Sequence, residues 1–334
     1  MTEYHLHTPV ASLPSIEDTL SLIDRADALG YDRAWVPETW GRDAVSTLAA
    51  ASTRIESIGL GSSILNVYSR SPAVLGQTAA TLAELTPTSF RLGIGPSGPA
   101  VIEHWHGLEY DRPLRRTRET AEIVRSICNG SVVDFDGDIF ELQGFRLRCD
   151  PPSPPPAVDL AGLGPKSIEL AGFIGDGWHA MLTTREGFSE QLNHLTRGMD
   201  KADRDRDAVE VTLGLTCCAL EDADRARSLT AGHIAFYTGA MGTFYGRSLA
   251  RQGFEQEAMD IASAWQSGNR KEAIEIVETE LLDELAVAGT PAETVEQLES
   301  FAEFDGVDAV AVSFPRGASM EEIEATIDTL APRD

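Results

Sequence analysis

A carboxylate and two imidazoles stand where catalytic side chains could work. Glu38 follows a predicted strand, and its carboxylate could stabilise charge or act as an acid, or simply form a salt bridge with Arg42. His5 and His7 alternate along the first predicted strand and therefore point to the same side of it. We expect His5 to pack in the core, whereas His7, nearer the end of the strand, is equally consistent with packing and with catalysis.

Two glycine-rich loops, each directly after a predicted strand, could hold an anionic group. Residues 93–98, GIGPSG, satisfy the G-x-G-x-x-G spacing of dinucleotide-binding folds, but Pro96 delays any helix and no acidic strand end follows about 20 residues later. Residues 161–167, AGLGPKS, join a strand to a helix start, where free N–H groups attract phosphate and where Lys166 and Ser167 could add hydrogen bonds. Either loop could also be an ordinary turn. Their occurrence on neighbouring strands favours an anionic cofactor.

The remaining histidines and cysteines do not indicate a metal or a disulfide framework. Residues 103–106, EHWH, offer nitrogen ligands and a carboxylate without a third strong ligand at useful spacing, so we predict no metal site. His179, on a later predicted strand, either lines the pocket or packs in the core. The four cysteines lack C-x-x-C spacing, which fits a protein of the reducing cytoplasm.

Strand-like and helix-like segments alternate through most of the chain, which predicts an α/β protein. Capping boxes mark helix starts at Ser15 with Asp18 and at Thr290 with Glu293. The eight predicted strands cover residues 3–8, 33–37, 57–62, 90–94, 158–161, 177–182, 209–219 and 307–314. Eight strands that are each followed by a helix match a (β/α)₈ TIM barrel, in which the site lies at the C-terminal ends of the strands.

The 334 residues exceed the roughly 250 of a plain barrel, and two segments account for the excess. Residues 221–285 are mostly helical in pattern, and we expect them to form a helical insertion after the seventh strand. Residues 132–147 predict a short hairpin excursion. We find no convincing domain boundary, so we expect residues 1–334 to form a single barrel domain.

The charge of the chain excludes two classes of partner. Fifty-three Asp and Glu residues against 27 Lys and Arg give a net charge of −26, which disfavours nucleic acids and anionic membrane surfaces. Only Lys166, Lys201 and Lys271 are lysines, and we interpret this acidic, arginine-biased composition as a salt-adapted surface. No apolar run approaches the roughly 18 residues needed to cross a bilayer, and no signal peptide is visible, so we expect a cytoplasmic protein.

Five motifs, taken in order, resemble the bacterial-luciferase-like superfamily, and specifically its branch that uses the 5-deazaflavin coenzyme F420. They are residues 36–43 (VPETWGRD), 60–72 (LGSSILNVYSRSP), 92–96 (LGIGP), 161–166 (AGLGPK) and 288–291 (AGTP). Each is weak alone, but their order and spacing are specific and extend over nearly the whole chain. Within that branch the chain is most similar to the methylenetetrahydromethanopterin reductases and to related oxidoreductases of salt-loving archaea.

The resemblance implies roles for individual residues. It implies a non-prolyl cis peptide between Ser63 and Ile64 whose bulge presses on the deazaflavin ring, and a hydrogen bond from Asn66 near that ring. It also implies that the two Gly-Pro loops carry the phosphate side of the cofactor. Thr39 stands where the family commonly has histidine, and threonine cannot be the base that the alcohol dehydrogenases of the family need. The implied cofactor-binding residues are Ser63, Ile64, Asn66, Gly95, Pro96, Gly162, Gly164, Pro165 and Lys166.

We therefore expect an enzyme that transfers a hydride between coenzyme F420 and a small substrate, with Glu38 and His7 as catalytic residues. By resemblance the substrate is a methylene-tetrahydropterin or folate one-carbon carrier that is reduced to the methyl form, and Glu38 could stabilise its iminium. One alternative is an FMN-dependent luciferase-like monooxygenase, and another is a non-catalytic flavin-binding paralogue. We also expect a homo-oligomer, either a dimer or a tetramer.

Overall fold

Eight parallel strands close into a barrel, as the sequence predicts. The computed structural model describes residues 2–9 and 13–333. Around the barrel the order is β1-β2-β3-β4-β7-β8-β9-β11, and β11 pairs with β1 to close the ring. These strands are β1 (Glu3–His7), β2 (Arg33–Val36), β3 (Gly59–Asn66), β4 (Phe90–Gly95), β7 (Ala157–Ala161), β8 (Gly177–Met181), β9 (Glu210–Ala219) and β11 (Ala309–Ser313).

Helices surround the barrel, and their first residues explain where most of them begin. Both predicted capping boxes are present, because the Ser15 and Thr290 side chains accept from the backbone N–H groups of Asp18 and Glu293. Pro72 and Pro165 occupy first helical positions, where the missing N–H has no partner to lose. The outer helices are α1 (Ile16–Ala28), α2 (Ala44–Ala51), α3 (Pro72–Leu85), α4 (Pro113–Cys128), α5 (Pro165–Ile174), α6 (Arg185–Lys201), α12 (Pro291–Ala302) and α13 (Met320–Thr329).

Large polar and aromatic side chains occupy the barrel interior, where many barrels have branched aliphatic residues. Trp35 is fully buried, and a Cβ atom on Gly61 of the neighbouring strand would lie 2.2 Å from its ring. A Cβ atom on Gly177 would similarly lie 2.5 Å from the Asp159 carboxylate. Glycines on β3 and β8 therefore make the space that these interior side chains fill.

Five helices occupy the segment where the sequence predicts a helical insertion. They are α7 (Ala223–Ala240), α8 (Thr243–Arg251), α9 (Glu255–Gln266), α10 (Arg270–Glu280) and α11 (Leu282–Leu285). Arg251, at the end of α8, donates to the Leu163 carbonyl at 3.1 Å, and Gln252 accepts from the Thr184 N–H at 2.8 Å. Because Leu163 and Thr184 follow the C-terminal ends of β7 and β8, α8 is fastened to the mouth of the barrel.

The sequence did not predict β10 (Ala286–Gly289), which joins these helices to α12. β10 pairs in parallel with the last four residues of β9, a stretch that overlaps the part of β9 paired with β11 only at Thr216. Its four small or branched residues, AVAG, directly follow a helix and precede a capping box, which left too short a pattern to recognise.

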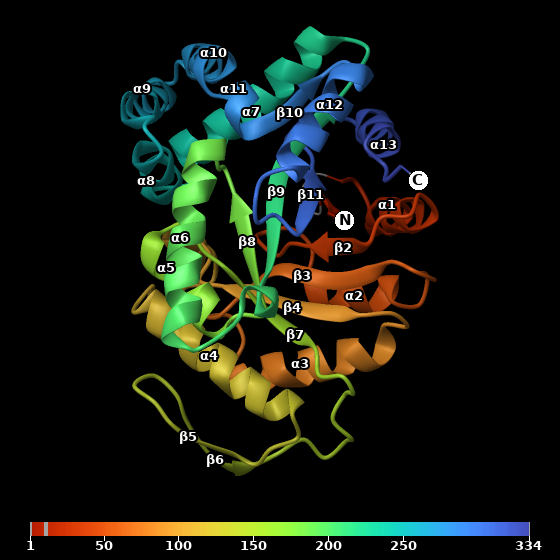
Figure 1. The fold of residues 1–334 in the computed structure, drawn as a ribbon, viewed down its shortest axis with the longest axis vertical. Coiled ribbons are helices and arrows are strands. Elements are labelled where there is room, and N and C mark those ends of the chain that lie inside the picture. The colour runs from red at the N-terminus through yellow and green to blue at the C-terminus, as the bar shows by residue number, and fades with distance from the viewer. Residues whose placement is uncertain (1, 10–12, 334) are drawn as a thin grey trace.

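The predicted hairpin excursion is present as the antiparallel pair β5 (Val133–Asp136) and β6 (Glu141–Phe145). Figure 1 shows this hairpin at the opposite end of the molecule from α9 and α10. Two short helical turns complete the described chain, the π-helix η1 (Val101–Trp105) and the 3₁₀-helix η2 (Arg206–Ala208).

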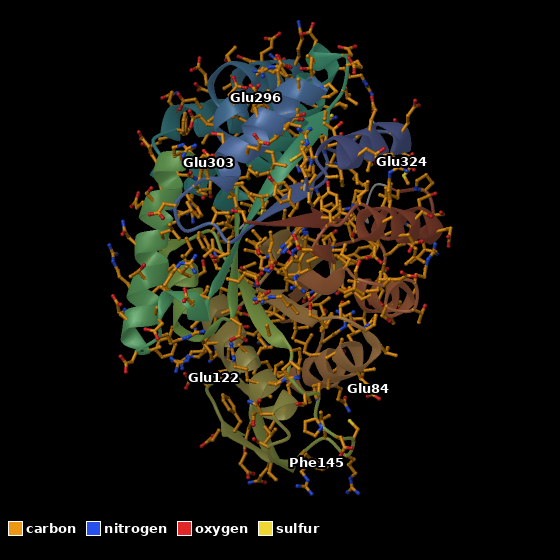
Figure 2. All side chains as sticks on the ribbon, turned by 45° about the vertical axis from the view of Figure 1, so that its right-hand side comes forward. Glu84, Glu122, Phe145, Glu296, Glu303 and Glu324 are labelled. Atoms are coloured by element: carbon orange, nitrogen blue, oxygen red, sulfur yellow. The ribbon has the colours of Figure 1, made fainter. Side chains whose placement is uncertain are left out.

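Acidic side chains are exposed on and beside the outer helices. Glu84, Glu296 and Glu303 lie on or just after α3 and α12 with exposed side chains (Figure 2). Across the described residues, no helix has the length and apolar character that a membrane span requires.

Candidate active site

The bulge on β3 is the feature that organises the mouth of the barrel. The peptide bond between Ser63 and Ile64 is cis, as the resemblance implies, and the pairing of β3 with β4 shifts register between Ser62 and Leu65. β3 itself continues to Asn66, four residues beyond its predicted end. The bulge therefore lies inside the strand and not in a loop after it.

The side chain of Ile64 brings three strands together at this point. A Cβ atom on Gly95, the last residue of β4, would lie 3.5 Å from Ile64 Cδ1 and 3.4 Å from the Cβ atom of Ala161. These are ordinary contact distances, so the bulge, the end of β4 and the end of β7 are neighbours. Pro96 follows Gly95, and the chain reaches only the π-helix η1 before α4, so no helix starts where a dinucleotide-binding fold needs one.

The second glycine loop, between β7 and α5, is held from two sides. The Trp178 indole N–H donates to the Gly162 carbonyl at 3.1 Å. The Ser167 hydroxyl accepts from the Gly164 N–H at 3.1 Å and lies 2.8 Å from the Gly164 carbonyl oxygen. The Ser167 hydroxyl is thus engaged within the loop, in contrast to its predicted role as a hydrogen-bond donor to phosphate.

Lys166 is the basic side chain that this loop presents to solvent. Its side chain is 75% exposed, and its ammonium group lies 3.4 Å from the Glu169 carboxylate. Pro165, at the first position of α5, has no N–H to offer. An anion at this helix start would therefore meet chiefly the Lys166 ammonium group, because the Gly164 N–H already donates to the Ser167 hydroxyl.

Glu38 is anchored at the mouth by a different arginine from the one considered in the sequence. Both of its carboxylate oxygens accept from the Arg70 guanidinium, one of them at 2.9 Å, and the Ala44 N–H donates to it at 3.1 Å. Arg70 also pairs with Asp43 at 2.7 Å. Arg42 instead donates to the carbonyls of Leu13 and Pro14. The arginine that holds Glu38 is thus Arg70, which follows β3 and reaches across to the end of β2.

His7 lies at the end of β1 among aromatic rings. Its ring centroid is 6.5 Å from those of both Trp35 and His179. Burial lowers the pKa of His7 to about 3, and the nearby His179 adds to this effect. His7 is therefore neutral at neutral pH and can offer one hydrogen-bond donor and one acceptor, but no charge.

Asn66 shapes the turn that follows the bulge. Its side-chain oxygen accepts from the backbone N–H groups of Tyr68 at 3.1 Å and Ser69 at 2.7 Å. The amide nitrogen lies 3.4 Å from His106 Nε2. Asn66 is thus next to the bulge, with its oxygen committed to the backbone and its nitrogen facing the histidine that follows η1.

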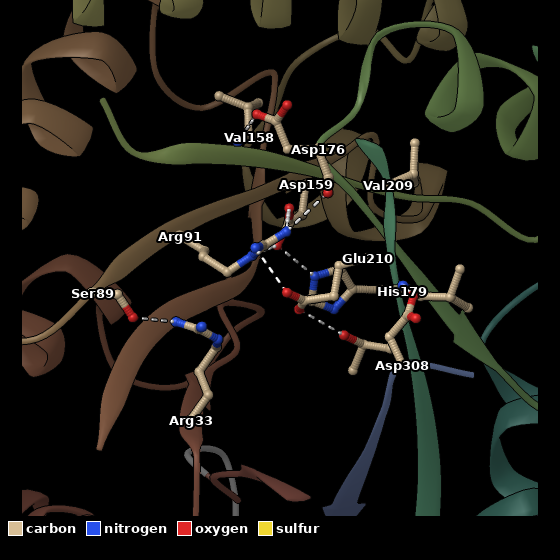
Figure 3. Close-up of polar contacts among 12 residues, drawn as sticks. Arg33, Ser89, Arg91, Val158, Asp159, Asp176, His179, Val209, Glu210 and Asp308 are labelled. Atoms are coloured by element: carbon tan, nitrogen blue, oxygen red, sulfur yellow. Dashed lines mark hydrogen bonds and ion pairs between the residues drawn. The ribbon is translucent and has the colours of Figure 1, made fainter. Parts of the chain in front are cut away.

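Sequence reasoning missed a column of charged side chains below the bulge. Asp159, only 1% exposed, receives two hydrogen bonds from Arg91 at 2.8 and 2.6 Å (Figure 3). His179 lies between this pair and the bulge, with Nδ1 3.1 Å from Ser63 Oγ. The sequence did contain a signal, because Arg91 and Asp159 lie within predicted strands. A charge in a barrel interior needs a partner, so two such residues could have indicated a buried ion pair.

At the other end of the barrel, one group among the described residues has metal-ligand geometry. The ligand atoms of Glu3, His5 and Glu210 lie within 4.8 Å of one another. The Trp35 indole can only donate, and it lies 3.1 Å from His5 Nδ1, so the neutral ring carries its proton on Nε2, 2.9 Å from the Glu3 carboxylate. Arg91 also pairs with Glu210 at 2.9 Å. A metal at Nε2 would have to displace that proton, so we assign this group to hydrogen bonding.

A family model described as luciferase-like monooxygenase matches residues 2–308. The 5,10-methylenetetrahydromethanopterin reductase of Archaeoglobus fulgidus is 28% identical over 299 residues, covering 87% of this chain and 88% of that protein.

Two solved structures share the fold over almost their whole length. The coenzyme F420-dependent tetrahydromethanopterin reductase from Methanopyrus kandleri superposes with a TM-score of 0.85 at 21% identity, covering 99% of this chain and 97% of that chain. An F420-dependent secondary alcohol dehydrogenase has a TM-score of 0.76 at 19% identity, covering 100% and 99%.

Proposed function

Because this chain belongs to the luciferase-like monooxygenase family, we propose that it is a coenzyme F420-dependent oxidoreductase. The proposed reaction transfers a hydride between the deazaflavin and a methylene-tetrahydropterin or folate one-carbon carrier. The names of the similar reductases from Archaeoglobus fulgidus and Methanopyrus kandleri support both the cofactor and the substrate class. When bound, the deazaflavin supplies the hydride chemistry, while the protein supplies binding and orientation.

The observation that carries this proposal is the position of the Ile64 bulge against the ends of β4 and β7. A Cβ atom on Gly164 would meet nothing closer than the Ser167 hydroxyl at 3.7 Å, and one on Gly98 would meet nothing within 4 Å. The backbone at Gly164 and at Gly98 is therefore open on one side, as the close approach of a planar ring and its phosphate tail requires, whereas a Cβ atom on Gly162 would lie 2.4 Å from the Ser167 Cβ atom. The residues proposed to hold the cofactor are Ser63, Ile64, Asn66, Gly95, Pro96, Gly162, Gly164, Pro165 and Lys166.

We assign the electrostatic part of catalysis to Glu38 and a hydrogen-bonding part to His7. Arg70 and the Ala44 N–H hold the Glu38 carboxylate in one position at the mouth, where it can stabilise positive charge on an iminium substrate. His7 is neutral and can orient a polar group of the substrate or ring. Thr39 follows Glu38 and offers only a hydroxyl, which disfavours oxidation of alcohols.

Cofactor identity and turnover test this proposal together. The protein is purified, the absorbance spectrum and mass of any co-purifying small molecule are measured, and cofactor-free protein is reconstituted separately with coenzyme F420 and with FMN. Reduced deazaflavin on the protein is then mixed with methylene-tetrahydromethanopterin, or with acetone as a control, in a stopped-flow instrument. We expect rapid oxidation with the pterin and none with acetone.

The other outcomes favour the alternatives. FMN binding with oxygen consumption would support a monooxygenase, the activity in the description of the family model. Tight binding of either cofactor without turnover of any carrier would support a non-catalytic flavin-binding protein.

A further inference from the structure

We propose that His179 is a positioning residue, which holds the Ser63 hydroxyl and thereby fixes the bulge against which the deazaflavin ring lies. This inference rests on the proposed function, because it concerns the same cofactor site. His179 is on β8 and Ser63 on β3, so their contact crosses the interior of the barrel. Neither residue needs to touch the substrate for this role.

The contacts of His179 give its ring a defined hydrogen-bonding direction. Nδ1 lies 3.1 Å from Ser63 Oγ, and Nε2 lies at a longer 3.5 Å from the Asp159 carboxylate. Burial alone would raise the pKa of Asp159, but the charge of Arg91 and the hydrogen bonds from His179 and Arg91 hold it well below its usual range. Asp159 is therefore an ionised carboxylate, which can only accept.

The protonation pattern of the histidine follows from that acceptor. When the imidazole of His179 is neutral it has one N–H, and the nearby carboxylate of Asp159 favours its placement on Nε2. Nδ1 is then a bare lone pair that faces Ser63, so the Ser63 hydroxyl donates to it. The Ser63 hydroxyl is thereby held toward His179, and it does not turn toward the position proposed for the deazaflavin ring.

Both the ring and its carboxylate partner are fixed from several sides. Trp35 packs edge-on against His179, with ring centroids 4.5 Å apart and planes at 79°. Arg91, which holds Asp159, also donates to the Asp176 carbonyl at 3.0 Å and pairs with Glu210 at 2.9 Å. Figure 3 shows Arg91, Asp159, Glu210 and His179 converging from separate strands. The position of Ser63 is thus fixed, through His179, relative to these charged side chains in the barrel interior.

The bulge transmits this position to the cofactor site. Ile64 follows Ser63, and its side chain lies against Gly93 and Gly95 of β4. Loss of the hydrogen bond at Ser63 leaves its side chain and the adjoining backbone with more freedom. The ring would then be bound less tightly and held less accurately for hydride transfer, which is sensitive to small misplacements.

Two substitutions of His179 separate positioning from packing. His179→Asn places an amide where Nδ1 stands and can keep the bond to Ser63, whereas His179→Gln reaches toward Nε2 and Asp159 and leaves Ser63 without a partner. Ser63→Ala removes the same bond from the other side. We expect His179→Gln and Ser63→Ala each to lower deazaflavin affinity and the single-turnover rate by about three- to tenfold. His179→Asn should recover most of both.

The double variant Ser63→Ala/His179→Gln completes the test. If the two residues act through one bond, it should be no worse than either single variant. Thermal melting of each variant gives the stability control. If Asn and Gln variants lose affinity in proportion to stability, or if the double variant shows the product of both losses, His179 only packs and the inference is wrong.

A second measurement does not depend on the cofactor. With ¹⁵N-labelled histidine, NMR of the cofactor-free protein reports which nitrogen of His179 carries the proton, and Ser63→Ala should shift the Nδ1 signal. A proton on Nδ1, or no change on Ser63→Ala, would overturn the inference even if the wild-type protein bound no deazaflavin. Failure of the wild type to bind or oxidise the cofactor, with the expected NMR result, would count against the proposed function alone.

Discussion

Arg70 donates from Nη1 and Nη2 to the two carboxylate oxygens of Glu38, and this pair joins the loop after β3 to the loop after β2 at the mouth of the barrel. The carboxylate of Glu38 is only 10% exposed, and Arg70 is 19% exposed. A largely buried ion pair with two hydrogen bonds fixes geometry better than a surface pair does. Two roles for Glu38 follow, as a charge at the reacting centre or as the partner that holds Arg70.

Substitution of each partner distinguishes the two roles. Glu38→Gln keeps the shape but removes the negative charge, and we expect it to slow hydride transfer by at least about tenfold, or 1.4 kcal/mol in barrier. Arg70→Gln keeps the carboxylate and should slow transfer less. Stopped-flow oxidation of the reduced deazaflavin by methylene-tetrahydromethanopterin measures both. Equal losses in the two variants would mean that Glu38 serves only the ion pair.

The two lysines that contact Glu169 form a matched pair. Lys166 lies in the loop between β7 and α5, whereas Lys201 ends α6 and pairs with the same carboxylate. We expect Lys166→Ala to weaken deazaflavin binding by roughly tenfold or more, since a charge-assisted hydrogen bond contributes about 1.5–3 kcal/mol. Lys201→Ala should leave affinity unchanged. Titration of both variants with the deazaflavin measures the difference. If the two variants bind it equally well, the loop between β7 and α5 is an ordinary turn.

Gly95 and Gly93 should respond differently to an added methyl group. At Gly93 a Cβ atom would lie 2.0 Å from the backbone oxygen of Ser62, so Gly93→Ala should destabilise the fold by at least about 1–3 kcal/mol. At Gly95 the Cβ atom finds ordinary contacts, so the fold should persist, while the methyl group enters the space assigned to the cofactor. We expect roughly tenfold weaker deazaflavin binding for Gly95→Ala. Thermal melting and titration with the deazaflavin check the two variants. If Gly95→Ala binds the deazaflavin as tightly as the wild type does, the cofactor does not lie against β4.

His7 should make the protein sensitive to mild acid. Its pKa is lowered by burial from about 6.5 to about 3, so between these values the unfolded chain binds a proton that the folded protein does not. The contribution of His7 to the free energy of unfolding is therefore complete above pH 6.5 and is lost as the pH falls toward 3. His7→Gln should therefore flatten the dependence of melting temperature on pH between 6.5 and 4. His233, whose pKa burial lowers to about 4, should act in the same direction. If the double variant His7→Gln/His233→Gln keeps the wild-type slope of melting temperature against pH, both assignments are contradicted.

The acidic surface should make stability depend on salt. Repulsion among the excess negative charges is screened within about 3 Å at 1 M salt but extends about 30 Å at 0.01 M. The exposed glutamates on the outer helices illustrate how widely that charge is spread (Figure 2). Melting temperature should rise across this range of salt. A flat response would remove the salt-adaptation hypothesis.

The local chemistry of the sequence was enough to predict the barrel but not its interior. Capping boxes and first-turn prolines act within a few residues, so α1, α3, α5 and α12 begin where expected. Pairing across the barrel is different, since Arg91 and Asp159 are 68 residues apart and meet only through the register of β4 and β7. No spacing rule connects them in one sequence.

The same limit explains the errors at the site. Arg42 is close to Glu38 in sequence, whereas Arg70 is 32 residues away and reaches Glu38 only because β2 and β3 are neighbours. The cis peptide at Ser63–Ile64 came from resemblance to a family, because no local preference of serine or isoleucine predicts one. The roles of the site residues stay predictions until the variants are measured.

The pairing of β10 with β9 has a consequence for how this protein can change. Ala219 lies opposite Gly289, and the Leu220 N–H donates to the Gly289 carbonyl at 3.0 Å, so residues 220–289 leave the end of β9 and return beside it. Closure entropy grows slowly with loop length, by only about 0.6 kcal/mol for each doubling. Helices in this segment could therefore lengthen, shorten or be exchanged without altering the gap that the chain must bridge. The helices of this segment can therefore change in evolution while the eight strands of the barrel keep their arrangement.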